Sequence, residues 1–194
     1  PLLCTLRTNK EYTYSHAIDL CILALVFGHH LGLADEELMK LASGLLLIDI
    51  GKTQIKPSIL NKSTPLDDDE YRQINQHVDY SVQILKRMPD VPDDIVHIAL
   101  THHERFDGSG YPNGLTKKNA PIYGRIAAIL DCYSAMSKQR PYSPATTPHK
   151  SLQHLRQWKN RYFDEELVEQ FQMCMGSYPN GSLVELNSGQ VALV

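Results

Sequence analysis

Residues 102–112, HHERFDGSGYP, place two adjacent histidines and a glutamate directly before a glycine-rich turn. A histidine pair at a helix end followed by Gly and Pro is common helix-stop chemistry, so this stretch alone is compatible with a purely structural role. Glycine also tolerates positive φ and lets the backbone approach a ligand closely, which suits a binding site. The other histidines and acids of the chain decide between the two roles.

Outside this stretch, most of the chain shows the apolar periodicity of helices. Gly51 is expected to end the second helix, and Asp67 to cap the third. We expect helices over these ranges: 12–31, 36–48, 67–87, 92–103, 121–137, 147–159 and 164–175. The tail SLVELNSGQVALV has two short β-prone runs around a turn and predicts a hairpin. The sequence therefore predicts an all-α domain over residues 1–181 with a small C-terminal β-hairpin, residues 182–194, appended to it.

Composition limits the class of protein. The chain has 194 residues, 42% of them hydrophobic and 21% charged, which suits one globular domain with a single core. A net charge of −3 argues against a DNA- or RNA-coating surface. No apolar run reaches membrane-spanning length, and the cysteines form no C-x-x-C pair that would indicate a structural zinc site. Because the chain starts with Pro1, we expect it to be part of a longer protein, located in the cytoplasm.

Ligand-type side chains lie within these apolar runs. His16 and His77 lie in the middle of expected helices, and Asp49 and Asp131 lie at the end or in the middle of strongly apolar segments. Each has a structural explanation when taken alone, such as a hydrogen-bonded core histidine or a helix-end carboxylate. An unpaired carboxylate is costly in such surroundings, and a divalent cation bound with neutral imidazoles removes that cost. Together with Lys52, the set favours a metal-dependent hydrolytic site acting on phosphate.

The signature HHERFDGSGYPNGL is similar to that of the HD-GYP family, HHE-x-x-DGxGYPxGL. The match continues through nearly the whole chain, with YSH at 14–16, DIGK at 49–52, RIAAILDCYSAM at 125–136 and RPY at 140–142. The resemblance implies an all-helical HD-type phosphohydrolase fold and a di- or trinuclear metal centre, usually of iron or manganese. It also implies hydrolysis of the bacterial second messenger cyclic di-GMP by an output domain that follows a sensory or receiver region.

The resemblance assigns roles to individual residues. Lys52 and Arg140 match the basic residues that approach the substrate phosphate, with Lys52 and Asp49 at the catalytic centre. Tyr111 is the tyrosine of the GYP loop and is expected to contact substrate. The family's metal ligands match His16, Asp49, His77, His102, His103 and Asp131, with Asp49 as the bridging carboxylate.

The GYP loop has two expected roles. Asp107 and the glycines at 108 and 110 suit a loop that lies beside the site and forms one wall of the substrate cleft. GYP loops are also proposed to contact diguanylate cyclase domains, so the loop could instead bind such a partner. The sequence leaves both roles open.

Three positions depart from the family pattern. Ile48 replaces the histidine of the HD pair, Tyr12 replaces a glutamate of trinuclear relatives, and Ser134 replaces a second aspartate. We therefore expect two metal ions at most, iron or manganese before zinc, nickel or magnesium. One site keeps Asp49, His77, His102 and His103, and the other keeps His16, Asp49 and Asp131. The second should be weakened, since loss of an outer-shell partner alone costs about 10- to 100-fold in affinity or activity.

Three functions remain open from the sequence. The first is a phosphodiesterase of weakened activity that converts cyclic di-GMP to pGpG or GMP. The second is an inactive module that binds cyclic di-GMP or a diguanylate cyclase. The third is an HD-type hydrolase of another nucleotide. Ile48 together with an intact GYP loop favours a domain that still recognises its ligand over one that keeps its catalytic rate. For the oligomeric state, a homodimer is one alternative.

Overall fold

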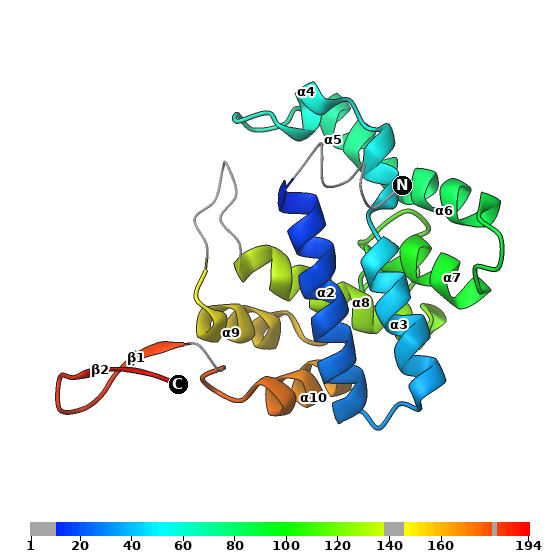
Figure 1. Cartoon of the computed structure of the whole chain (residues 1–194). Coiled ribbons are helices and arrows are strands. Elements are labelled where there is room, and N and C mark those ends of the chain that lie inside the picture. Colours follow the sequence, from blue (N-terminus) through cyan, green and yellow to red (C-terminus); the bar gives the residue numbers. More distant parts are fainter. Residues whose placement is uncertain (1–10, 138–145, 180–181) are drawn as a thin grey trace.

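The computed structural model describes residues 11–137, 146–179 and 182–194 of the chain. Helices pack around one another, and a two-stranded antiparallel hairpin projects at the periphery (Figure 1). In chain order the elements are α2 (Glu11–His30), α3 (Asp35–Leu47), η1 (Ile50–Gln54), α4 (Pro57–Leu60), α5 (Asp68–Asn75), α6 (His77–Arg87), α7 (Asp93–Thr101), η2 (Lys117–Asn119), α8 (Ile122–Ser137), α9 (Pro148–Trp158), α10 (Glu165–Met175), β1 (Leu183–Glu185) and β2 (Val191–Leu193). The all-α prediction with a C-terminal hairpin is confirmed. Among the described helices, none combines the length and the apolar character that a membrane span needs.

A large hydrophobic core lies between α2, α3, α8, α9 and α10. Its residues on α2 recur at helical spacing, as with the fully buried Leu20, Ala24 and Phe27. Phe27 and Tyr133 each pack edge-on against Phe171 of α10, with ring centroids 5.1 Å apart. A smaller core joins η1, α6 and α7. The two cores hold the C-terminal end of α3 from both sides.

Asp49 is fixed between these two cores. Ile48 is fully buried in the large core and Ile50 is fully buried in the small one. Asp49 itself has φ −102° and ψ 13°, in the sparsely populated bridge region where many active-site residues lie. Because both neighbours are locked in apolar packing, the Asp49 carboxylate has little freedom to move.

The segment after Asp49 lies directly against α6. A Cβ atom at Gly51 would lie 2.0 Å from the carbonyl oxygen of His77 and 2.5 Å from the amide nitrogen of Ser81. The buried Ser81 hydroxyl accepts a hydrogen bond from the Gly51 N–H (2.9 Å) and donates one to the Ile48 carbonyl (3.0 Å). The expectation that Gly51 ends the second helix is wrong: α3 ends at Leu47, and Gly51 is required for the close contact with α6.

The expected continuous helix over 67–87 is two helices, α5 and α6, which are separated at Gln76. Asp67 caps α5 as predicted. At the break, the carbonyl of Ile74 accepts a hydrogen bond from the Nδ1 atom of His77 at 2.7 Å. The regular hydrogen-bond pattern of the helix is thus interrupted at the position where the carbonyl of Ile74 bonds to the His77 ring.

Gly51→Ala should lower the free energy of unfolding by about 1–3 kcal/mol, because the added methyl group would overlap the backbone of α6. Gly189→Ala in the hairpin turn is the control: φ there is positive (79°), but no atom lies within 4 Å of the added Cβ. Strain at Gly189 can be relieved by local opening, so the urea midpoint should change little. Equal midpoint shifts for the two variants would contradict the tight contact between Gly51 and α6.

Candidate functional site

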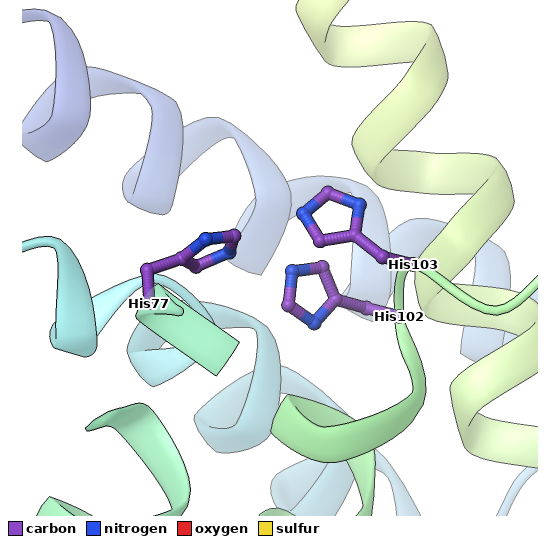
Figure 2. Close-up of side chains that lie close together, drawn as sticks. All are labelled: His77, His102 and His103. Carbon is purple, nitrogen blue, oxygen red and sulfur yellow. The ribbon is translucent and has the colours of Figure 1, made fainter. Parts of the chain in front are cut away.

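Three histidine side chains converge in the interior of the fold (Figure 2). His77 is the first residue of α6, while His102 and His103 directly follow α7, and one ring nitrogen from each lies within 4.8 Å of the other two. His77 and His102 are buried, and His103 is half-buried. The packing of α6 against α7 in the small core brings these residues together across the sequence. The structure thus gathers three of the predicted ligands.

Backbone carbonyls set the orientation of two of these rings. Nδ1 of His77 donates to the carbonyl of Ile74 (2.7 Å), and Nδ1 of His102 donates to the carbonyl of Ala99 (2.8 Å). A carbonyl can only accept, so Nδ1 carries the proton and Nε2 keeps its lone pair. Neither Nε2 atom, although buried, has a hydrogen-bond partner within the described part of the chain. This is the arrangement in which metal-binding histidines are held.

The carboxylate of Asp49 faces this cluster. Its Oδ1 atom lies 3.3 Å from Nε2 of His77 without forming a hydrogen bond, and its Oδ2 atom accepts a hydrogen bond from Nζ of Lys52 at 2.6 Å. Two acceptor atoms at this separation repel each other unless a cation lies between them. Ligands bound to one divalent ion at about 2.0–2.2 Å are separated by a similar distance, so the residues fit a metal ion.

Burial keeps the imidazoles neutral. It lowers the pKa of His77 to about 4, and it lowers the pKa of His102 against the opposing charges of the nearby carboxylates. The pKa of His103 falls well below its usual value through burial and the neighbouring His102. Burial acts to raise the pKa of Asp49, but the Lys52 ammonium and the imidazoles lower it overall. At neutral pH the site therefore offers neutral nitrogen donors and an ionised carboxylate, as metal binding requires.

His16 and Asp131 form a pair beside this cluster. Nε2 of His16 lies 2.9 Å from Oδ1 of Asp131, and Nδ1 of His16 lies 3.0 Å from the hydroxyl oxygen of Ser134. Burial acts to raise the pKa of Asp131, but the hydrogen bond from His16 lowers it well below its usual value. The charge of Asp131 also acts on His102, whose pKa it tends to raise. Ser134, which the sequence marked only as the replacement of a family aspartate, contacts His16 directly.

The loop after His103 folds back onto the helix end that carries it. Buried Glu104 accepts the Asn113 N–H with Oε1 (2.7 Å) and the Leu115 N–H with Oε2 (2.8 Å). The Tyr111 N–H donates to the carbonyl of His103 at 3.2 Å. Glu104 had no role expected from the sequence, and its position directly after the histidine pair is the signal that could have identified it.

Both loop glycines have the roles that the sequence allowed. Gly108 has a positive φ of 82°, and a Cβ at Gly110 would lie 2.3 Å from the amide nitrogen of Arg105. The ring of Tyr111 stacks on the imidazole of His103, with centroids 4.6 Å apart and planes inclined by 25°. Burial raises the pKa of the Tyr111 phenol, which therefore stays protonated.

Two positions discussed from the sequence lie outside the part of the chain that the structure describes. These are Arg140, matched to substrate binding, and the side chain of Tyr12. Lys52 is accordingly the expected phosphate-binding residue that the described structure places at the site, through its hydrogen bond with Asp49.

Known proteins resemble this chain over most of its length. The family described as HD domain matches residues 5–167. Cyclic di-GMP phosphodiesterase PA4108 of Pseudomonas aeruginosa is 34% identical over 192 residues, which cover 99% of this chain and 46% of the relative. The 3'3'-cGAMP-specific phosphodiesterase 2 of Vibrio cholerae is 37% identical over 164 residues, 84% of this chain and 31% of the relative. The chain thus spans less than half the length of these curated relatives.

Solved structures share the fold. The HD domain of the L. monocytogenes phosphodiesterase PgpH, in complex with cyclic-di-AMP, has a TM-score of 0.65 at 19% identity and covers 90% of this chain and 94% of that chain. The cyclic GMP-AMP specific phosphodiesterase V-cGAP3 of V. cholerae has a TM-score of 0.62 at 18% identity and covers 81% and 43%. At these identities the likeness concerns the arrangement of helices.

Mn(II) at a concentration one hundred times its dissociation constant should stabilise the parent protein by about 2.7 kcal/mol. The thermal unfolding midpoint should rise accordingly. His102→Ala removes a buried ligand nitrogen and should abolish most of this rise. His97→Ala is the matched control, because His97 is exposed and lies on α7, the helix that His102 directly follows. Differential scanning fluorimetry with and without chelator measures both variants. An equal Mn(II) effect in the two would place the metal elsewhere.

Proposed function

Since this chain belongs to the HD domain family and carries the HD-GYP signature, we propose that it is a metal-dependent phosphodiesterase acting on cyclic di-GMP. The observation that carries the proposal is a set of buried ligand atoms, Asp49 Oδ1, His77 Nε2 and His102 Nε2, that have no hydrogen-bond partner among the residues the structure describes. Relatives named for hydrolysis of cyclic di-GMP and of cGAMP support a cyclic dinucleotide as the substrate class.

We propose that the site holds one or two divalent ions, iron or manganese first, because imidazole and carboxylate together suit these metals. Asp49 and the three clustered histidines would hold the first ion. His16 and Asp131, with Asp49, would hold a second if their mutual hydrogen bond gives way. A divalent ion in such a site acts as a Lewis acid and lowers the pKa of water for attack on phosphorus.

Lys52 would supply positive charge to the substrate phosphate. Its side chain is 23% exposed, while that of its partner Asp49 is 6% exposed, so the ammonium lies between the buried ligands and solvent. A charge in this position can neutralise the oxygens of a phosphodiester while the buried carboxylate stays with the histidines. Arg140, which only the resemblance assigns, would act with Lys52.

Ile48 is the reason to propose weakened activity. Its side chain is fully buried in the large core, and an isoleucine offers no ligand atom. The same observation supports the second candidate function, a receptor that binds the cyclic dinucleotide without turning it over. The two candidates rely on the same site residues and the same loop and differ only in catalysis.

Protein loaded anaerobically with Fe(II) or Mn(II) should convert cyclic di-GMP to pGpG, and a chelator should abolish the product. Ile48→His should raise turnover about 10- to 100-fold by restoring a ligand. Lys52→Ala should lower turnover by about 100-fold, because charge stabilisation of the phosphoryl group is lost. Lys40→Ala is the matched control, since Lys40 pairs with Glu36 on α3 away from the histidines. Chromatography of the nucleotides gives the rates.

The same assay with 3'3'-cGAMP tests the choice of cyclic dinucleotide. If 3'3'-cGAMP is turned over faster than cyclic di-GMP, then 3'3'-cGAMP is the preferred substrate and the proposed phosphodiesterase reaction is unchanged. If neither the parent nor Ile48→His forms product, while equilibrium dialysis detects bound cyclic di-GMP, the phosphodiesterase proposal fails and the receptor function stands.

A further inference from the structure

His103 differs from the other histidines of the site in how its ring is held. His16, His77 and His102 each have a hydrogen bond at Nδ1 that sets the orientation of the imidazole. No hydrogen bond reaches either ring nitrogen of His103 from the residues that the structure describes. A ligand histidine normally has an orienting partner of this kind, and losing it costs metal affinity.

Tyr111 lies where it can replace that partner. Its ring stacks on the His103 imidazole at a centroid distance of 4.6 Å and an inclination of 25°. The centroid of the His102 ring lies 3.9 Å from that of the His103 ring. Contact between ring faces limits rotation of the imidazole about its χ2 angle. The Tyr111 N–H also donates to the carbonyl of His103, so one residue fixes both the ring and the backbone of this ligand.

Glu104 holds Tyr111 in this place. Each of its carboxylate oxygens accepts a hydrogen bond from a peptide N–H in the second half of the loop, at Asn113 and Leu115, and the residue is 4% exposed. Hydrogen bonds to an ionised carboxylate are stronger than neutral ones. On the outgoing side, a Cβ at Gly110 would overlap the backbone at His103 and Arg105, so the loop lies directly on the helix end. The loop cannot lift from the site without breaking these contacts.

We propose that Tyr111 is a positioning residue for the metal ligand His103, and that Glu104 acts through the loop to keep the tyrosine ring on the imidazole. This rests on the proposed metal site but requires no substrate. It assigns the loop a role directed inward, toward the metal. A substrate contact through the phenol would depend on the hydroxyl group, whereas positioning depends on the flat ring alone.

Titration of the full chain with Mn(II), followed by the EPR signal of the free ion and without nucleotide, tests the proposal. Tyr111→Phe keeps the ring and should bind Mn(II) with the parent affinity. Tyr111→Leu keeps an apolar side chain, though a smaller one, but loses the stacking face, and should bind about 10- to 100-fold more weakly. Tyr178→Leu is the matched control, because Tyr178 also stacks on a histidine, His149, at 4.9 Å outside the site. It should leave the Mn(II) affinity unchanged.

Glu104→Gln gives a second variant of nearly identical shape, which decides the question if Tyr111→Leu fails to fold. Its amide NH2 would face a peptide N–H, so it should also weaken Mn(II) binding while Tyr111→Phe does not. Parent affinity in both Tyr111→Leu and Glu104→Gln would overturn the positioning role, as would equal losses in Tyr111→Phe and Tyr111→Leu. Failure of the metal site itself has a different signature: the parent would bind no Mn(II), or His102→Ala would bind as well as the parent.

Discussion

Two acceptor atoms, Oδ1 of Asp49 and Nε2 of His77, face each other at 3.3 Å in the interior of the fold with no hydrogen bond between them. Each buried polar atom left without a partner costs about 1–3 kcal/mol, and Nε2 of His102 adds a third. A protein maintains such an arrangement only where the surrounding structure holds it in place. A bound cation, as proposed, would satisfy all three atoms at once.

The fold holds these atoms through backbone contacts. The Ser81 hydroxyl ties the Ile48–Gly51 turn to α6, so the carboxylate and the first histidine are parts of one rigid unit. Burial of Ile48 in the large core is worth about 2 kcal/mol. In the proposed metal centre this side chain would supply no ligand to a second ion. In the proposed centre, a complete first site would therefore stand beside a second site with fewer ligands.

The sequence predicted the main helices and the hairpin from apolar periodicity, and the stretch 102–112 drew attention to two of the three histidines that the structure brings together. It did not predict the break at Gln76, since no Gly or Pro marks it; at this break the carbonyl of Ile74 accepts a hydrogen bond from the ring of His77. The orienting carbonyls are invisible in any sequence, as every residue has one. Glu104 was visible but uninterpreted, because its partners are peptide N–H groups whose positions depend on how the loop returns.

Anomalous diffraction from a crystal of the Mn(II)-loaded protein, recorded on both sides of the manganese absorption edge, tests the account most directly. We expect a peak bounded by Oδ1 of Asp49 and the ring nitrogens of His77, His102 and His103, at about 2.0–2.3 Å from each ligand atom. A weaker second peak beside His16 and Asp131 would agree with a reduced second site. Manganese absent from the histidine cluster, or bound only at surface carboxylates, would contradict the central claim that these buried atoms exist to hold a metal ion.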